Sequence, residues 1–408
     1  MNFTTKGPQN SAFALIVALS MAQTLVALPG SGLGAWELDD NADFPGFQAY
    51  LSSRVAAPHE NLDVGGRIAV HILDASKRPV PFALWRATEE GVGRGSGRAF
   101  SDGSFALYPA SIGGSPKEHL YGIELSARGA STTATTSIAN GGELDIELPG
   151  ALPLTSPIAC DVVFVIDTTI SMKKYLEAIK LAVVAASEAI ASFDPPLALR
   201  VGVVLYRDRG DDYLVKATPL SPDLSTLRET LSLAVAKGGG DIPEDLGAGL
   251  RSAVTGMDFA KEGIRLIFAF TDALPSMRPG PLDSGGARYS EACVAAMESG
   301  IKIYTIGLGT VAMDGSYALR QIAQYTGAAY LAADLGEPAT PPGGAGLVRG
   351  ALETLISRIV QGEARAGQAA IFDTRPPVVE KVQPPVVALP PEPARDPALV
   401  LLESVQAR

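Results

Sequence analysis

The sequence contains few residues that bind soft metals or form disulfides. Only two cysteines occur, Cys160 and Cys293, and the three histidines, His59, His71 and His119, are scattered. There is no CxxC motif and no Cys/His cluster, so a zinc site of the usual kind is not expected. Cys160 opens an expected strand and Cys293 lies in an expected helix. Whether the two form a disulfide or stay as buried thiols is left open by the sequence.

Positive charge is also scarce. Lys and Arg number 33 against 44 Asp and Glu, which gives a formal net charge of -11. A nucleic-acid binder normally presents a basic face, so that class is disfavoured. The 408 residues, 47% of them hydrophobic, indicate a globular chain of two or three domains.

Only one long apolar run is present, residues 12–28, and Lys6 is the only charge ahead of it. This pattern predicts a secretory signal, with residues 1–35 forming the signal and a spacer, and cleavage near Ala22 or later near Ala35. An uncleaved membrane anchor is the alternative, although the run is short for a bilayer core of about 30 Å. We therefore expect an exported protein, periplasmic or extracellular, that meets a membrane only if this segment is retained.

Residues 36–63 are mixed and loop-like, and the pattern changes over residues 64–150. Short alternating strands separated by Gly and Pro turns predict a small β-sandwich there. The segment "VHILDASKRPVPFALWR…GRAFSDGSFAL" resembles the carboxypeptidase-regulatory-like sandwich family. The expected strands cover residues 67–73, 82–85, 104–108, 121–125, 132–135 and 143–148.

Residues 155–362 alternate buried strands with helices. Such alternation predicts the α/β class, a Rossmann-like, doubly wound, mostly parallel sheet with helices on both faces. A last helix over residues 347–360 is expected to pack back on the sheet. Residues 363–408 follow as a tail expected to be disordered, because residues 376–397 contain eight prolines.

The first buried strand ends at Asp167, and the motif Asp167-Thr168-Thr169-Ile170-Ser171 follows it. Alternate residues of an extended turn point the same way, so Asp167, Thr169 and Ser171 are expected on one side. A carboxylate and two hydroxyls are hard oxygen donors that suit Mg²⁺, Mn²⁺ or Ca²⁺. Alone, such a motif is more often just a helix N-cap, because Asp, Ser and Thr favour helix starts.

Two further acids are expected to lie near this loop. Asp241 lies in the glycine loop Gly238-Gly239-Gly240, and Asp272 closes another buried strand. Open α/β sheets bind ligands at the carboxyl ends of their strands, so these acids are expected to converge with Asp167. Converging carboxylates repel unless a cation lies between them, which predicts a divalent-metal site.

Four segments, "DVVFVIDTTISM", "YRDRGDDYL", "GGGDIPEDLGAGL" and "LIFAFTDALP", occur in this order. Together they resemble the von Willebrand factor A (VWA) family and its metal-ion-dependent adhesion site. The resemblance implies metal contacts from Asp167, Thr169, Ser171, Asp241 and Asp272, and an open position filled by an Asp or Glu of a protein partner.

Two residues depart from the family pattern. Ile170 replaces a small residue, and Asp241 stands where many members have threonine. Arg207, Asp208 and Asp211 are candidates for the rim of the site, or for a solvated charged loop.

The sequence is consistent with three functions. The first is an exported binding module without catalytic activity that recognises an acidic group through the metal. The second is an envelope scaffold whose metal site meets no partner. The third is a metal-dependent hydrolase, which is disfavoured because no nucleophile–base pair, no GxxxxGK[ST] loop and no histidine near the acids are present in the sequence.

Overall fold

The computed structural model describes residues 30–54, 57, 59–109, 120–137, 142–152, 154, 157–240, 243–277, 287–309, 311, 315–336, 338 and 347–368. All of them belong to one compact unit, Met1–Asp373. The predicted signal segment (residues 12–28) and the proline-rich stretch (residues 376–397) lie outside the described residues. Among the helices of the described residues, none has the length and apolar character needed to cross a membrane.

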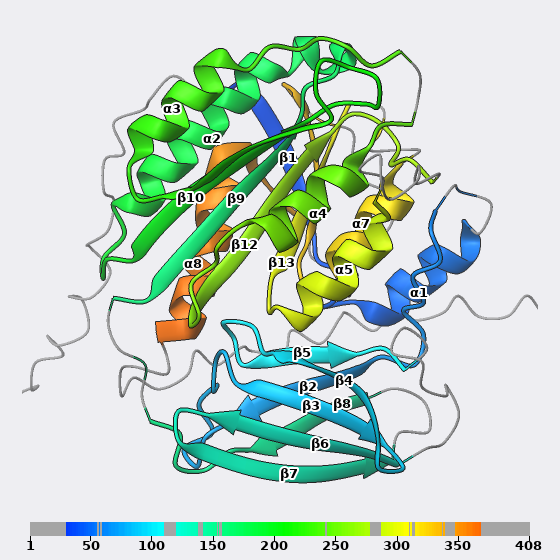
Figure 1. Ribbon diagram of the computed structural model, residues 1–408, viewed down its shortest axis with the longest axis vertical. Coiled ribbons are helices and arrows are strands. Elements are labelled where there is room, and N and C mark those ends of the chain that lie inside the picture. Colours follow the sequence, from blue (N-terminus) through cyan, green and yellow to red (C-terminus); the bar gives the residue numbers. More distant parts are fainter. Residues whose placement is uncertain are drawn as a thin grey trace, which may run out of the picture. The chain divides into compact units, whose positions relative to one another are not determined.

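A central eight-stranded sheet is formed mainly by the second half of the chain (Figure 1). Its strand order is β11-β10-β9-β12-β13-β14-β1-β15, and the five strands from β10 to β14 are parallel. Strands β11, β1 and β15 extend it at the two sides in antiparallel pairs. The strands are β9 (Ala159–Asp167), β10 (Ala198–Tyr206), β11 (Val215–Ser221), β12 (Gly263–Thr271), β13 (Lys302–Leu308), β14 (Tyr330–Leu335), β1 (Leu33–Leu38) and β15 (Val348–Ala351). The predicted doubly wound α/β fold is confirmed.

Helices cover both faces of this sheet because the central strands are apolar on both sides. Val162, Phe164 and Ile166 of β9 face one hydrophobic core, and Val163 and Val165 face the other. Helices α2 (Leu176–Ala191), α3 (Leu224–Leu233) and α8 (Leu352–Gln368) pack into the first core. Helices α1 (Phe44–Ser53), α4 (Leu246–Gly256), α5 (Tyr289–Glu298) and α7 (Ser316–Tyr325) pack into the second.

The two cysteines lie on opposite faces of the sheet. Cys160 belongs to the first core and Cys293 to the second, and both are buried free thiols. This settles the question that the sequence left open. The sheet layer separates the two sulfur atoms, so they do not form a disulfide.

The N-terminal flank of the sheet differs from the sequence prediction. Residues 36–63 were expected to be loop-like, with a spacer before them, yet β1 pairs with β14 and β15 and α1 follows it. Leu33, Ala35 and Leu38 of β1 are buried. The reason is long-range pairing, since a six-residue strand becomes stable only when β14 and β15 lie beside it.

A β-sandwich lies between α1 and β9 in the chain. One sheet has the order β5-β2-β8 and the other β4-β3-β6-β7. The rings of Trp85 and Phe105, one from each sheet, stack with centroids 4.9 Å apart. All six expected strands occur, and only β4, a Gly-rich and Arg-rich segment, was not predicted. The strands are β2 (Ile68–Leu73), β3 (Leu84–Glu89), β4 (Val92–Arg98), β5 (Ser104–Leu107), β6 (Leu120–Ala127), β7 (Ala130–Ser137) and β8 (Gly142–Glu147).

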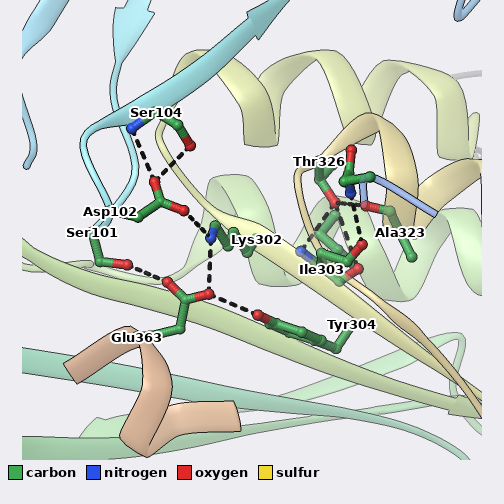
Figure 2. A network of polar contacts seen from close by, with 11 residues as sticks. Ser101, Asp102, Ser104, Lys302, Ile303, Tyr304, Ala323, Thr326 and Glu363 are labelled. Atoms are coloured by element: carbon green, nitrogen blue, oxygen red, sulfur yellow. Dashed lines mark hydrogen bonds and ion pairs between the residues drawn. The ribbon is translucent and has the colours of Figure 1, made fainter. Parts of the chain in front are cut away.

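A buried polar network joins the sandwich to the central sheet (Figure 2). The Lys302 ammonium at the start of β13 lies 2.9 Å from Asp102 of a sandwich turn and 2.8 Å from Glu363 of α8. Glu363 also accepts hydrogen bonds from the hydroxyls of Tyr304, at 2.8 Å, and Ser101. We call these five residues the junction network.

The C-terminal helix is longer and later than expected. Helix α8 begins at Leu352 rather than near residue 347, because residues 348–351 pair with β1 as strand β15. It also includes residues 363–368, which the sequence assigned to the tail. Glu363 is buried there as part of the junction network.

Candidate metal centre

The candidate site forms where two neighbouring parallel strands end. Ile166 of β9 lies opposite Phe270 of β12, so Asp167 and the Thr271-Asp272 step emerge at the same edge of the sheet. Asp167 and Thr169 are fully buried, whereas Ser171 is exposed. The strand register therefore brings together residues that are about a hundred positions apart in the sequence.

Hydrogen bonds join Thr169 to Asp167 and Ser171 to Asp272, and the two hydroxyls lie near each other. The Thr169 backbone N and hydroxyl donate to Asp167 Oδ1 at 2.8 and 2.7 Å. The Thr169 and Ser171 hydroxyl oxygens lie 3.2 Å apart, and Ser171 Oγ donates to Asp272 Oδ1 at 2.7 Å. Two carboxylates and two hydroxyls thus converge at one point, as the motif spacing predicted.

The glycine loop closes the site from a third side. Ile170 N donates to Gly238 O at 3.0 Å, which ties this loop to the loop after β9. Gly239 has a φ of +66°, and a Cβ built on it would lie 3.0 Å from Thr169 Cβ and 3.1 Å from Glu244 Oε1. The absence of a side chain therefore allows close packing here. Asp241, the fifth predicted ligand, lies outside the described residues.

Glu244 is an acid of this site that the sequence analysis missed. Pro243-Glu244 looked like an ordinary helix start, because proline and an acid favour the first turn. In the structure Glu244 is 4% exposed, it lies beside Gly239, and its Oε2 atom is buried without a hydrogen-bond partner. A buried carboxylate oxygen lacking a partner would have been the signal, and burial cannot be read from local sequence.

The acids of the site are held in an environment that disfavours their charge. Burial raises the pKa of Asp167 to about 7, and the Asp272 carboxylate adds to the rise. Burial, with Asp167 and Asp208 nearby, raises the pKa of Glu244 to about 8. Burial also raises the pKa of Asp272, against a hydrogen bond from Ser171. A cation placed among these groups would favour their ionised forms.

The donor set fits a hard divalent cation. In the described part of the chain, no group of three or more His, Cys, Asp or Glu side chains could hold a metal ion. A cation here would therefore draw on the hydroxyl oxygens of Thr169 and Ser171 together with the carboxylates of Asp167 and Asp272, and Glu244 lies beside this group. All five donors are oxygens, which suits Mg²⁺, Mn²⁺ or Ca²⁺ better than a soft metal.

Two of the residues considered for the rim, Arg207 and Asp211, support the loops with their side chains. Arg207 is 2% exposed, and its guanidinium donates to Thr168 O at 3.2 Å and Val235 O at 2.8 Å. Asp211 Oδ2 accepts from Gly239 N at 2.8 Å and from Asp208 N at 3.2 Å. Buried backbone groups need such partners, so Arg207 and Asp211 hold the loops in place.

An open α/β sheet that gathers carboxylates and hydroxyls at its strand ends defines a class of ligand-binding domains. Residues 161–338 match the von Willebrand factor type A domain. This part of the chain is therefore a VWA domain, and the sandwich precedes the matched residues. A comparison with curated proteins found no significant match.

Several solved structures are similar to this chain. The pilus adhesin SpaC from Lactobacillus rhamnosus GG has 14% identity and a TM-score of 0.36 over 62% of this chain and 33% of that chain. The conserved hypothetical protein BatB from Bacteroides thetaiotaomicron has 15% identity and a TM-score of 0.35 over 51% of this chain and all of that chain. Proximal thread matrix protein 1 from the mussel byssus, with a zinc-occupied MIDAS motif, has 15% identity and a TM-score of 0.32 over 52% of this chain and 48% of that chain.

These structural similarities are distant. The chain spans about a third of the length of the pilus adhesin. At such identities and TM-scores, no ligand, partner or activity is transferred from these proteins to this chain.

Proposed function

We propose that this protein is an exported, non-enzymatic binding module. Its VWA domain uses a divalent cation, held by Asp167, Thr169, Ser171, Glu244 and Asp272, to recognise an acidic group on a protein partner. Asp241 is expected to add a further oxygen donor. The observation that carries the proposal is the pair of hydrogen bonds from Thr169 to Asp167 and from Ser171 to Asp272, beside the buried Oε2 atom of Glu244, which has no hydrogen-bond partner.

The burial of the donors supports recognition rather than a closed structural site. Asp167, Thr169 and Glu244 are buried, whereas Ser171 is exposed and Asp272 is half-buried. A cation bound by these residues would be held from the protein side and approached from solvent beside Ser171 and Asp272. Such an arrangement leaves room for an oxygen ligand from another molecule.

A pull-down from the native envelope in Mg²⁺, repeated in EDTA, tests the function. Wild type should retain a partner only in Mg²⁺, and Asp167→Ala and Asp272→Ala should lose both the partner and tight metal binding. Asp145→Ala, which removes a carboxylate on sandwich strand β8, is the matched control and should behave as wild type.

Each competing function gives a different result. Metal binding by calorimetry without any EDTA-sensitive partner indicates a scaffold. Turnover of ester or phosphate substrates that stops with Asp167→Ala indicates a hydrolase. Unchanged metal affinity in Asp167→Ala shows that the metal site has been misplaced. The export component is tested separately, because a mature chain in the cytosol that retains Met1 would contradict it.

A further inference from the structure

A short 3-10 helix, η1 (Ile170–Lys174), begins inside the candidate site. A 3-10 helix has three residues per turn, so residues i and i+3 lie on the same side. Ser171 and Lys174 therefore share one side, and Ile170 and Lys173 share another, while Met172 is buried. Because Ser171 Oγ donates to Asp272, the first of these sides faces the site.

The other residues of this helix are exposed at the edge of the site. Ile170 is 53% exposed although it lies between two donors, Thr169 and Ser171. The hydrogen bond from its backbone N to Gly238 O fixes its position. Lys173 and Lys174 are also exposed. The Lys174 ammonium lies 4.5 Å from the Tyr175 ring centroid, next to the metal side of the helix.

The charge of this edge contrasts with the charge of the whole chain. The formal net charge is -11, and Lys173-Lys174 is the only Lys-Lys pair in the sequence. Within the described residues, neither lysine forms an ion pair. An acidic chain thus places two exposed lysines and one exposed isoleucine beside a site that fits a cation.

We propose that Ile170, Lys173 and Lys174 form a recognition rim that selects one class of partner. That class is an extended acidic segment in which the metal-binding Asp or Glu has an apolar neighbour and a second acid nearby. The inference rests on the proposed function and adds to it the chemistry of the partner. The rim residues determine specificity, and the metal donors supply the common carboxylate contact.

Each rim residue contributes through a different interaction. Burying the exposed half of Ile170 against an apolar side chain should tighten binding about fivefold. Lys174 lies on the side of Ser171, where it can donate to the carboxylate oxygen that does not face the cation. Lys173 lies beside Ile170 and can pair with a second acid. An exposed ion pair of this kind should add up to about fivefold.

Four synthetic peptides immobilised at equal density provide the probe. Gly-Gly-Asp-Gly-Gly presents the acid alone, Gly-Leu-Asp-Gly-Gly adds an apolar neighbour, Gly-Gly-Asp-Gly-Glu adds a second acid, and Gly-Leu-Asp-Gly-Glu carries both. Wild type at saturating Mg²⁺ should bind the last peptide most tightly, by about tenfold or more over the first. Binding of all four should disappear in EDTA.

Matched variants separate the two contributions. Ile170→Ala should lose only the gain from leucine, and its control is Leu181→Ala on α2, because Leu181 is 51% exposed. Lys173→Gln with Lys174→Gln should lose only the gain from the second acid. Its control is Lys261→Gln, which precedes β12 and so lies at the strand end away from Asp272. Calorimetry should show unchanged Mg²⁺ affinity in Ile170→Ala and in both controls. Because Lys174 interacts with Asp272, the lysine variant is compared with wild type at Mg²⁺ concentrations that saturate both.

The outcomes distinguish this inference from the function on which it rests. If the four peptides bind equally in Mg²⁺ and dissociate in EDTA, the rim inference is wrong and the proposed function stands. If the rim variants still bind the leucine and glutamate peptides more tightly than the first peptide, other residues recognise the partner and the rim inference is also wrong. If no peptide binds in Mg²⁺, both the rim inference and carboxylate recognition are contradicted.

Discussion

Glu244 shows how one side chain changes the character of the candidate site. Without it, the described part of the site has two carboxylates, Asp167 and Asp272, joined by hydroxyls. With it, a third carboxyl lies beside Gly239 and is buried with one oxygen that has no partner. Burial, together with the neighbouring carboxylates, makes Asp167 and Glu244 costly to ionise in the absence of a cation.

Metal binding should therefore release protons near neutral pH. The pKa of Asp167 is raised to about 7 and that of Glu244 to about 8, whereas a bound cation requires both to be ionised. The Mg²⁺ affinity of the site should rise with pH by up to about tenfold per pH unit for each proton released. It should level off above about pH 8. Calorimetry in buffers of different ionisation enthalpy counts these protons. Glu244→Gln should release fewer, and an affinity independent of pH from about 6 to about 8 would contradict the assignment.

The same groups set the pH dependence of the metal-free protein. Their pKa values in the fold lie above the ordinary 3.8 of Asp and 4.5 of Glu. The unfolded chain therefore ionises first as pH rises, and the stability that protonated Asp167 and Glu244 contribute is lost between about pH 4 and about pH 8. We expect the melting temperature in EDTA to fall over this range, and excess Mg²⁺ to offset the fall. An equal loss in the presence of Mg²⁺ would show that these acids do not hold the cation.

Sequence patterns predicted which of these residues lie close together, for physical reasons that can be named. Asp167 and Asp272 were found because each follows an apolar strand, and parallel strands end at one edge. Thr169 and Ser171 were found because alternate residues share a side. Glu244 and Arg207 were misjudged, because their roles depend on burial by segments far away in the chain. The metal assignment of the predicted residues, Asp241 included, stays a prediction.

At the scale of elements, the glycine loop is the most sensitive part of the site. Gly239→Ala should weaken metal binding by about tenfold or more, since a positive φ alone costs about 1–2 kcal/mol in a residue with a Cβ. The added Cβ would also press on Thr169 and Glu244. Gly240→Ala is the control, because nothing lies within 4 Å of a Cβ there and its φ is not positive. Equal effects of the two substitutions would show that the loop adapts.

Strand β1 is the element that sequence patterns could not identify. Its six residues gain stability only by pairing Leu38 with Tyr330 and Trp36 with Arg349, and no local period reports such a pairing. The helices of the VWA domain were predicted because their apolar spacing is local. Signal cleavage near Ala35 would cut through β1, whereas cleavage near Ala22 would leave it whole.

Removal of β1 should destabilise the VWA domain. A chain that begins at Gly30 should unfold like the chain that begins after Ala22, and a chain that begins at Asp39 should be less stable by several kcal/mol. Burial of Leu33 and Leu38 alone accounts for about 3–6 kcal/mol at most. Urea denaturation of the three chains checks this prediction. Equal midpoints would mean that β14 needs no partner at this edge.

At the scale of the whole molecule, the junction network should make unfolding of sandwich and sheet interdependent. Lys302→Met leaves the buried Glu363 carboxylate without its cation, and loss of one partner of a buried pair costs about 3–5 kcal/mol. The control is Lys77→Met in the exposed Lys77–Glu147 pair, which should cost less than about 1 kcal/mol. Urea denaturation measures both. A loss at Lys302 no larger than that at Lys77 would show that the network contributes little.

The junction network should also make the stability of the fold depend on pH in acid. Burial opposes the charge of Asp102, but Lys302 and hydrogen bonds from Ser104 lower its pKa to about 2. Asp102 ionises at higher pH in the unfolded chain, so its contribution is present above about pH 4 and is lost as pH falls towards about 2. Lys302→Met should remove this part of the acid dependence.

The sandwich occupies an unusual place in the chain: β1 and α1 come before it and β9 to α8 come after it. The sandwich strands are contiguous, so each has its strand partners once residues 68–147 have been made. The central sheet has to wait, because β1 is made first and its partners β14 and β15 are made last, and contacts at such separation form slowly. A chain that emerges from its N-terminus would thus carry the unpaired apolar strand β1 until β14 and then β15 have been made. A binding partner or chaperone that covers β1 during this interval would act on assembly of the metal site rather than on the finished site.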